Sequence, residues 1–392
     1  MKRTSWANWS GSVVGRPAWR VVGADVAAVV AAVERARTEG VALRCVGTGH
    51  SQSPLCVTHG GLLALDSQVT LEIDAARREA WIGAGATLHD LEAPLRVEGL
   101  AFHNLGDVDV QTLAGAIGTG THGTGRELPN LSSALLGVRG VAADGSLFEW
   151  NVETEPDRIR AARVSLGSLG VMTSVRMRLA KAHRLHERTE RLSAEACLEQ
   201  LDGRSRATRH FELFWYPTRD RVDAKSLEPT DAAVNALADR PYERIDWSGR
   251  ILPSVRGERF VEMEYAIPAE LAGDVFAALR ARIRSRHPDL QWPVELRFVA
   301  ADDAWLSPAH GRATATLSLH QAADLPFRAV FEDLEPLLWE AGGRPHWGKW
   351  HGRTAAALSE RYPEWDAFQR LRRQVDPERR FIDALRPIGL LD

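Results

Sequence analysis

The sequence predicts an α+β protein of two domains, one of them containing an antiparallel sheet that helices cover on one face. The length of 392 residues suits two domains at about 150 residues each. A helical repeat over residues 24–39 precedes an apolar run over 41–46, and strict alternation recurs at 260–265, 294–299 and 313–319. Alternating strands and helices in this proportion favour an antiparallel sheet with helices on one face.

The first half of the chain is expected to hold short elements with clear boundaries. Apolar residues of the first helix share one face, and Gly40 ends it. Thr87 is expected to cap a second helix that runs to about Val97. Asp144-Gly145 is typical of a tight hairpin turn. Further strands are predicted at residues 61–66, 71–74, 80–85, 138–141, 147–150 and 173–179.

The composition changes after about residue 180. Residues 181–250 are charged and poor in glycine, and residues 220–240 show no clear strand period. The alternation at 260–265 and 294–299 predicts strands that are buried on one face only. Two helices are expected in this half, at residues 269–286 and 326–338.

Composition and charge exclude several classes of function. A net charge of −3 with no basic tract gives no electrostatic footprint for nucleic acid or a membrane surface. No apolar run approaches the roughly 20 residues of a membrane span, and the N-terminal residues do not resemble a secretory signal. Cys45, Cys56 and Cys197 lack metal-ligand spacing, so no metal site is expected, and we interpret them as reduced thiols of a cytoplasmic protein.

The segment Gly47-Thr48-Gly49-His50 follows a short buried strand and precedes Ser51. Its two glycines permit a tight turn and a close approach to a ligand, and successive turn amides can bind an anion. The histidine would then lie against the bound ligand. The alternative is a glycine-rich turn with an incidental histidine, because a single motif of this kind is a weak signal.

A second glycine-rich stretch strengthens the prediction of a ligand. Residues 115–125 contain five glycines, three threonines and a histidine, a composition that we expect to form neither a stable helix nor a well-packed strand. Its amides and hydroxyls would suit the phosphate and ribose oxygens of an extended ligand. Neither stretch has the pattern of a Rossmann fold or a P-loop.

Glu295 and Arg297 are two positions apart on a predicted strand, so their side chains share one face. Such a pair could orient and ionise a substrate hydroxyl. The alternative is a salt bridge on an exposed sheet face. Ser318 and His320 likewise share one face of the next strand, where they could complete a pocket.

These stretches together resemble the vanillyl-alcohol-oxidase type of flavoprotein, within the group of sugar-lactone and alditol oxidases. The pattern is most similar to that of L-gulono-1,4-lactone and D-arabinono-1,4-lactone oxidases. The resemblance implies a PCMH-type FAD-binding domain over residues 1–180, to which a tail over 346–392 returns, and a substrate-binding cap domain over 181–345. The matching stretches are residues 6–9, 46–54, 104–107, 113–125, 260–268, 295–308 and 344–349.

The resemblance implies that the His50 imidazole is bonded to the 8α carbon of FAD. Gly106 would lie beside the flavin edge that oxygen approaches, where the missing side chain favours an oxidase; the alternative is a glycine kept for its turn. For His122, a structural role and a flavin contact remain open. The FAD-lining residues implied are Gly47, Thr48, Gly49 and Ser51 at the pyrophosphate, Thr112, Gly115, Gly118, Thr119, Thr121, His122 and Gly123 along the rest, and Gly170 and Val171 at the adenine–ribose end.

The resemblance also implies the catalytic set. Lys349 would supply positive charge to the reduced flavin, while Glu295 and Arg297 would act on the substrate hydroxyl. Alditol oxidases usually have histidine at the position of Ser318 and threonine at that of His320, so this chain departs from their pattern.

The implied reaction is oxidation of an aldono-1,4-lactone, with hydride transfer to flavin N5 and reoxidation by oxygen to give hydrogen peroxide. Three alternatives remain: an alditol oxidase, a lactone dehydrogenase that uses another acceptor, and a flavin-binding protein without catalysis. The expected partners are a small sugar lactone or polyol and molecular oxygen. The sequence does not specify the oligomeric state.

Overall fold

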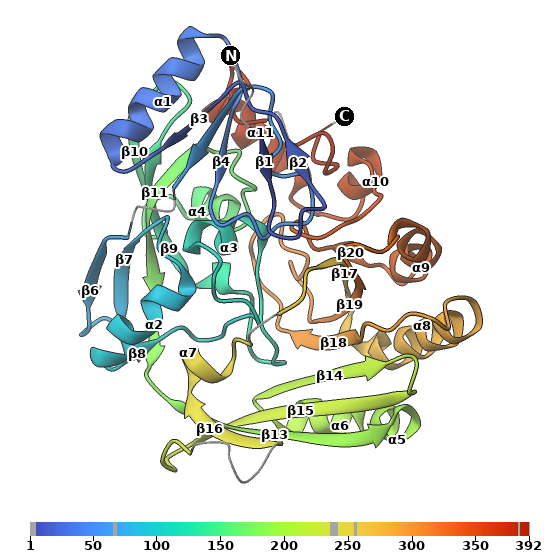
Figure 1. The fold of residues 1–392 in the computed structure, drawn as a ribbon. Coiled ribbons are helices and arrows are strands. Elements are labelled where there is room, and N and C mark those ends of the chain that lie inside the picture. Colours follow the sequence, from blue (N-terminus) through green and yellow to red (C-terminus); the bar gives the residue numbers. More distant parts are fainter. Residues whose placement is uncertain (1–4, 66–68, 236–241, 255–256, 383–384, 392) are drawn as a thin grey trace.

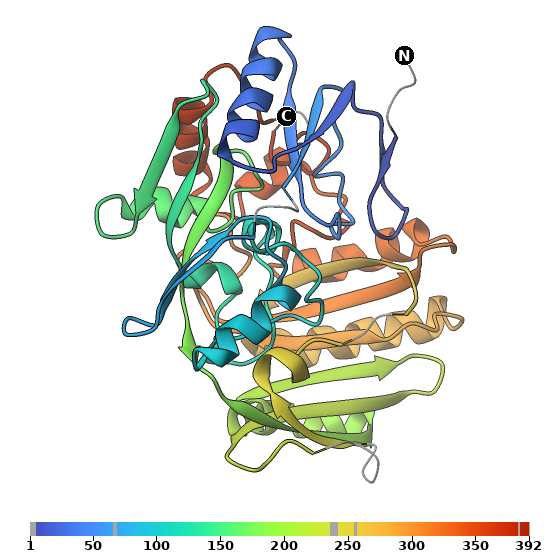
Figure 2. The same ribbon diagram turned by 60° about the vertical axis from the view of Figure 1, so that its left-hand side comes forward.

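The computed structural model describes residues 5–65, 69–235, 242–254, 257–382 and 385–391. Figure 1 shows the N-terminal elements on one side of the molecule and a large sheet with its helices on the other. The turned view in Figure 2 gives the same arrangement, with the blue and cyan elements above the yellow-green strands. Within these described ranges, no helix combines the length and apolar character needed to cross a membrane.

A small parallel sheet carries the first glycine loop. Its three strands lie in the order β3 (Trp19–Val22), β5 (Gly61–Ala64) and β4 (Leu43–Val46). Helix α1 (Val26–Thr38) connects β3 to β4 and is capped by Asp25, whose carboxylate accepts from the Ala28 amide at 2.8 Å. The predicted helix and both predicted strands are confirmed, within a few residues at their ends.

A five-stranded antiparallel sheet follows, in the order β10-β9-β11-β7-β6. The predicted hairpin at Asp144-Gly145 joins β9 to β10. The predicted cap of Thr87 on helix α2 is also present: the Thr87 hydroxyl accepts a hydrogen bond from the Asp90 amide at 3.1 Å. The strands are β6 (Leu71–Asp74), β7 (Glu79–Gly83), β9 (Leu135–Val141), β10 (Leu147–Asn151) and β11 (Val171–Arg178). The helices beside them are α2 (Leu88–Val97), α3 (Leu113–Thr119), α4 (Pro156–Ala162) and the 3-10 turn η1 (Leu131–Ala134).

The second glycine stretch contains a helix, so the expectation that it forms none was wrong. Helix α3 includes Gly115 and Gly118 and ends at Gly120, which has a left-handed φ of 73°. Its residues Leu113, Ala116 and Ile117 are fully buried. Short helices draw their stability from tertiary packing, and here the burial of one apolar face outweighs the poor helix propensity of glycine.

The large sheet has eight strands in the order β16-β13-β15-β14-β18-β19-β17-β20, all paired antiparallel. Helices α5, α6, α8 and α9 pack against one face of it, as predicted (Figure 1). The strands are β13 (Arg184–Ser193), β14 (His210–Tyr216), β15 (Arg221–Thr230), β16 (Glu243–Trp247), β17 (Phe260–Pro268), β18 (Val294–Val299), β19 (Thr314–Ala322) and β20 (Arg344–Pro345). The helical segments are α5 (Ala194–Glu199), α6 (Leu201–Ala207), α7 (Ser248–Ile251), η3 (Ala269–Leu271), α8 (Ala272–Arg286) and α9 (Arg328–Glu340).

Two expectations for this sheet need correction. Strand β15 lies within the segment that shows no strand period. It forms nevertheless, because its pairing with β13 and β14 stabilises it whatever the pattern of its residues. Residues 236–240 of that segment lie outside the described residues. Strands β17 and β18 are buried on both faces, not one. Their apolar residues face the helices, whereas their polar residues face the N-terminal half of the molecule.

The C-terminal segment returns to the N-terminal sheet. Helices α10 (Ala355–Ser359) and α11 (Trp365–Val375) lead to Phe381, whose ring packs in the same core as α1. The Leu43 amide donates to the Arg380 carbonyl at 2.8 Å, which fixes this return beside β4. The remaining short strands pair as β1 (Trp6–Ala7) with β2 (Val14–Gly15) and β8 (Leu100–Ala101) with β12 (Ala180–Lys181).

Candidate active site

The loop that follows β4 is held from outside by the N-terminal strand segment. Gly49 has a φ of +74°, and its carbonyl accepts from the Trp9 amide at 2.8 Å. The Asn8 side-chain amide donates to the Ser51 carbonyl at 3.0 Å. The Trp9 ring stacks on the His50 imidazole with centroids 5.2 Å apart. These contacts fix both the path of the loop and the direction of the histidine.

Both glycine stretches line one cavity, whose volume is about 960 Å³ including its open part. A Cβ added at Gly118 would meet nothing within 4 Å, so the α3 wall leaves open space there. This geometry fits an extended ligand such as a dinucleotide cofactor. The predicted residues in the lining are Gly47, Thr48, Gly49, His50, Ser51, Thr112, Gly115, Gly118, Thr119 and Gly170.

Five of the predicted cofactor residues lie outside that lining: Gly106, Thr121, His122, Gly123 and Val171. Val171 is buried in β11, where Met172 takes the place in the cavity wall. A Cβ added at Gly106 would lie 2.9 Å from the His122 carbonyl oxygen. This close approach gives a packing reason for glycine at position 106, while the predicted role in oxygen access and the alternative of a turn glycine both stay predictions.

Arg44 is a lining residue that sequence reasoning missed. It is buried on β4, and its guanidinium donates to the carbonyls of Leu55, Leu166 and Phe381 at 3.0, 2.8 and 2.6 Å. It therefore joins three separate segments beneath the cavity. A charged residue within an otherwise apolar strand run was the signal that could have identified it.

The His50 imidazole is neutral at physiological pH. Burial, together with the positive charge of Lys349, lowers the pKa of His50 to about 4. A neutral imidazole keeps a nitrogen lone pair, which is the form needed for a bond to an electrophilic carbon.

A second cavity of about 880 Å³ adjoins the first, and His50, Ser51, Gln111 and Thr119 line both. Lys349 lines this second cavity, and its ammonium group forms an ion pair with Glu262. Burial raises the pKa of the Glu262 carboxyl, but the charges of Lys349 and His320 and the hydrogen bond from Lys349 together outweigh this effect, and the net shift is downward. The cavity thus receives its cation together with a carboxylate counter-ion.

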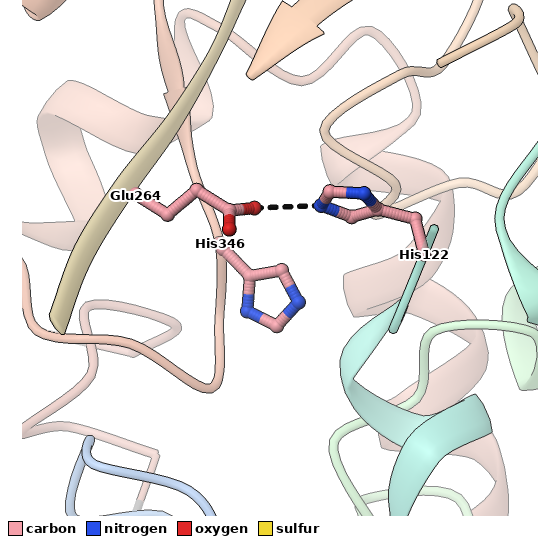
Figure 3. Close-up of side chains that lie close together, drawn as sticks. All are labelled: His122, Glu264 and His346. Carbon is pink, nitrogen blue, oxygen red and sulfur yellow. Dashed lines mark hydrogen bonds and ion pairs between the residues drawn. The ribbon is translucent and has the colours of Figure 1, made fainter. Parts of the chain in front are cut away.

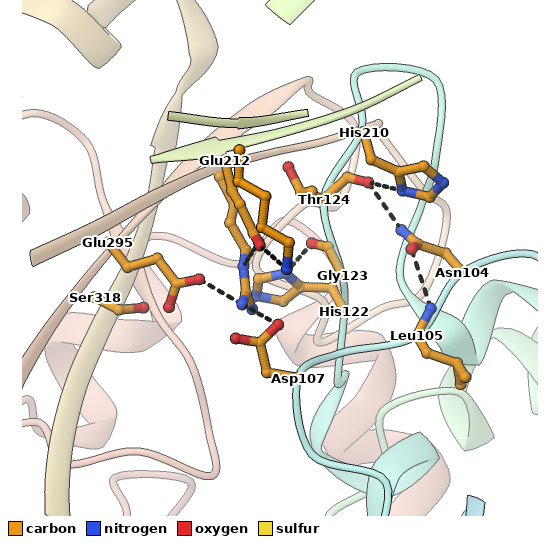
Figure 4. Close-up of polar contacts among 12 residues, drawn as sticks. Asn104, Leu105, Asp107, His122, Gly123, Thr124, His210, Glu212, Glu295 and Ser318 are labelled. Carbon is orange, nitrogen blue, oxygen red and sulfur yellow. Dashed lines mark hydrogen bonds and ion pairs between the residues drawn. The ribbon is translucent and has the colours of Figure 1, made fainter. Parts of the chain in front are cut away.

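Glu295 and Arg297 form the predicted ion pair, but the pair is buried rather than exposed. Arg297 also binds Asp107 and Glu212 at 2.6 and 2.8 Å. Figure 4 labels these two carboxylates and that of Glu295. Burial lowers the pKa of the Arg297 guanidinium, yet the three carboxylates outweigh burial and raise it well above its usual value. Neither residue contributes to the lining of the two cavities described above.

Ser318 and His320 share the inner face of β19, as predicted, and each lies beside a carboxylate of β17. The Ser318 hydroxyl donates to Glu264 at 2.7 Å, and His320 Nε2 lies 3.7 Å from Glu262. Neither Glu262 nor Glu264 was predicted as a site residue. Their alternating positions on β17 gave a signal, but an exposed polar face explained that pattern equally well.

His122 contacts Glu264 at 2.7 Å, and the His346 ring lies beside both (Figure 3). The donor atoms of these three residues lie within 4.8 Å of one another, as do those of Asp107, Glu212 and Glu295. Hydrogen bonding explains the first cluster and the Arg297 guanidinium explains the second, so neither requires a metal ion.

Comparisons with known proteins agree with this geometry. The family described as D-arabinono-1,4-lactone oxidase matches residues 232–386, and the FAD binding domain family matches residues 17–151. The chain is 33% identical to L-gulono-1,4-lactone dehydrogenase of Mycobacterium tuberculosis, over 96% of this chain and 97% of that protein. It is 30% identical to alditol oxidase of a Streptomyces species, over 97% and 98% of the two chains. The crystal structure of cholesterol oxidase from B. sterolicum shares the fold, with a TM-score of 0.84 at 16% identity over 98% and 97% of the chains.

Proposed function

The chain belongs to the vanillyl-alcohol-oxidase-type FAD flavoproteins, in their sugar-lactone oxidase group, and on that premise we propose that it oxidises aldono-1,4-lactones with oxygen as acceptor. The secondary alcohol at C2 of the lactone becomes a ketone, and oxygen is reduced to hydrogen peroxide. The observation that carries the proposal is the pair of joined cavities. Both glycine loops line the first, and Lys349 lines the second.

The cofactor is held by backbone amides and small side chains of the two loops. FAD, when bound, accepts a hydride from the substrate carbon and passes the electrons on. We propose that His50 would form a covalent bond to the 8α carbon of the flavin, replacing a C–H bond of that methyl group, with oxygen as the two-electron oxidant and hydrogen peroxide as its product. The neutral state of His50 and its fixed orientation against Trp9 support this bond. We also propose that residues 1–180 and 346–392 form the FAD domain and 181–345 the cap; the contact between Leu43 and Arg380 supports this division.

The substrate is handled by polar residues on the inner face of the large sheet. Glu295, paired with Arg297, would accept a hydrogen bond from the substrate hydroxyl and take its proton. Lys349 would stabilise the negative charge that develops when the cofactor is reduced. Ser318 and His320 would contact the remaining hydroxyl groups.

Oxygen as the acceptor rests on the comparisons. The matching family is named an oxidase, and so is the alditol-oxidising relative, whereas the M. tuberculosis relative is named a dehydrogenase. Gly106 gives little additional support for oxygen as the acceptor, since its close packing on His122 already explains why this position is a glycine. A cytoplasmic location is part of the same proposal, supported by the free state of Cys45, Cys56 and Cys197.

A panel of aldonolactones and alditols, tested with oxygen and with an artificial electron acceptor, tests the proposal. We expect turnover of lactones with formation of hydrogen peroxide. Preferential turnover of xylitol or sorbitol would instead support the second candidate, an alditol oxidase, which the 30% identity to such an enzyme favours. Turnover restricted to the artificial acceptor would refute the oxygen assignment.

A further inference from the structure

The second cavity is bordered on one side by residues 108–111, which lead into helix α3. Among the described residues of its lining, Asp109 alone is acidic. The Asp109 side chain is 23% exposed, and its neighbour Val110 is exposed to solvent. Asp109 therefore lies at the mouth of the cavity, where a molecule that enters meets it.

The path of this segment is fixed by its contacts with the first turn of helix α2. The His89 amide donates to the Asp109 carbonyl at 2.8 Å, and the Leu88 amide donates to the Gln111 carbonyl at 3.0 Å. The same histidine also holds the side chain, since its Nδ1 atom lies 2.9 Å from Asp109 Oδ2. In agreement, the hydrogen bond with Asp109 and the charge of this carboxylate raise the pKa of His89.

The two oxygens of the Asp109 carboxylate differ in what they bind. Oδ2 faces the His89 ring, whereas no described residue donates a hydrogen bond to Oδ1. An ionised carboxylate oxygen only accepts, and its hydrogen bonds with O–H groups are stronger than those between neutral groups. The alternative is that Asp109 serves only the N-terminal end of helix α2, where a negative charge is stabilising. That alternative predicts an effect on stability and none on the choice of substrate.

The substrate must enter this cavity with its reacting carbon towards the cofactor. His50 and Ser51 line both cavities, so they mark the end at which the cofactor meets the substrate. With C2 of an aldonolactone at that end, the carbon chain attached to C4 of the ring extends towards the mouth. In L-gulono-1,4-lactone this chain is C5 and C6, which carry two neighbouring hydroxyl groups. Two such groups can donate to one carboxylate.

We propose that Asp109 determines substrate specificity by accepting hydrogen bonds from the hydroxyl groups of the lactone side chain, and that His89 is the positioning residue that orients the Asp109 carboxylate. The inference rests on the proposed function and deepens it: the substrate class is aldonolactones with a hydroxylated side chain at C4. Asp109 takes no part in the oxidation itself, because it lines the second cavity and not the cofactor cavity.

Two lactones of different length separate this contact from a general loss of activity. L-gulono-1,4-lactone carries the side chain, and L-threono-1,4-lactone lacks it. With D109A we expect KM for the first lactone to rise about tenfold, the cost of a lost hydrogen bond to a charged group, with little change in kcat. KM for the second lactone should stay unchanged. D109N, which keeps the shape of the side chain, should raise the first KM in the same direction.

Two further variants test His89 and the charge at this helix end. H89A leaves the Asp109 carboxylate in place without its partner, so we expect a smaller rise in KM for L-gulono-1,4-lactone and none for L-threono-1,4-lactone. An unchanged KM in H89A would overturn the positioning role. D90A removes an exposed carboxylate of the same turn, which lines neither cavity, and should change neither KM. A rise in D90A as large as in D109A would indicate a general effect of charge and overturn the assignment.

The outcomes separate this inference from the proposed function. An unchanged KM for L-gulono-1,4-lactone in D109A, or equal changes for both lactones, would overturn the role of Asp109 and leave the proposed function intact. If the unaltered FAD-loaded protein turns over neither lactone, the proposed function itself fails, and the inference falls with it.

Discussion

The ammonium group of Lys349 forms an ion pair with the carboxylate of Glu262, which is buried on the inner face of β17. The cation that lines the second cavity is therefore matched by a negative charge from the large sheet. His320 lies beside the same carboxylate, with its Nε2 atom 3.7 Å from Glu262. The positive charge available to a bound cofactor depends on the balance between these groups, and each can be changed separately.

Substitution of the two partners should shift the flavin midpoint potential in opposite directions. K349M removes a positive charge, so we expect a lower potential and a loss of turnover of about 10²-fold. E262Q leaves the ammonium uncompensated and should raise the potential. K181M, which changes an exposed lysine of β12, is the control. Unchanged turnover in K349M would refute the electrostatic role of this lysine.

His50 should be required for covalent attachment of the flavin. After acid precipitation we expect yellow protein and a colourless supernatant from the unaltered chain, and the reverse from H50A. H59A, which changes an exposed histidine downstream of the same loop, should behave like the unaltered chain. A yellow supernatant from the unaltered chain would show that no covalent bond forms.

Glu295 and Arg297 should differ in what they contribute. R297A leaves the buried carboxylates of Glu212 and Glu295 and the partly buried Asp107 without their shared cation, so we expect a loss of about 3–5 kcal/mol in the free energy of unfolding, measured with urea. E295Q keeps the shape of the side chain and should be far less destabilised, yet lose about 10²- to 10⁴-fold in turnover. Full activity in E295Q would indicate a purely structural salt bridge.

Stability should fall as the solution becomes acidic. Burial lowers the pKa of His346 and His351 to about 4 and that of His210 to about 3. The unfolded chain therefore binds more protons than the folded chain between about pH 4 and the ordinary histidine value near 6.5, and stability is lost as the pH falls through this window.

Asp302 acts in the opposite direction. Burial raises the pKa of its carboxyl to about 6, so the folded chain holds the extra proton and stability falls as the pH rises between about 4 and 6. Three histidines outweigh one aspartate, and we expect a lower free energy of unfolding at about pH 5 than at about pH 7.5. In D302N the decrease in the free energy of unfolding between about pH 7.5 and about pH 5 should be larger than in the unaltered chain. A stability that rises towards acid pH would contradict the neutral state of the three histidines.

Local signals in the sequence predicted much of the fold. The helix after Asp25, the cap at Thr87 and the hairpin at Asp144-Gly145 each depend on neighbouring residues, and each is confirmed. Helix α3 and strand β15 were missed, because the first is stabilised by burial and the second by pairing with distant strands. Such long-range packing has no local signature in the sequence.

The site was predictable to a similar extent. The two glycine stretches, Lys349 and the Glu295–Arg297 pair were identified as candidates, and the structure brings them into neighbouring cavities and one sheet face. Glu262 and Glu264 were not identified, because alternation alone cannot distinguish a polar face in water from a polar face that is buried against other parts of the protein. Their partners, Lys349 and His122, come from distant parts of the chain.

Anaerobic mixing of the FAD-loaded protein with L-gulono-1,4-lactone tests the central claim most directly, because it separates the substrate from the acceptor. We predict rapid bleaching of the flavin absorbance, followed by its full return and one hydrogen peroxide per flavin when oxygen is admitted. Flavin that stays oxidised with every lactone, or reduced flavin that does not react with oxygen, would contradict the assignment as an aldonolactone oxidase.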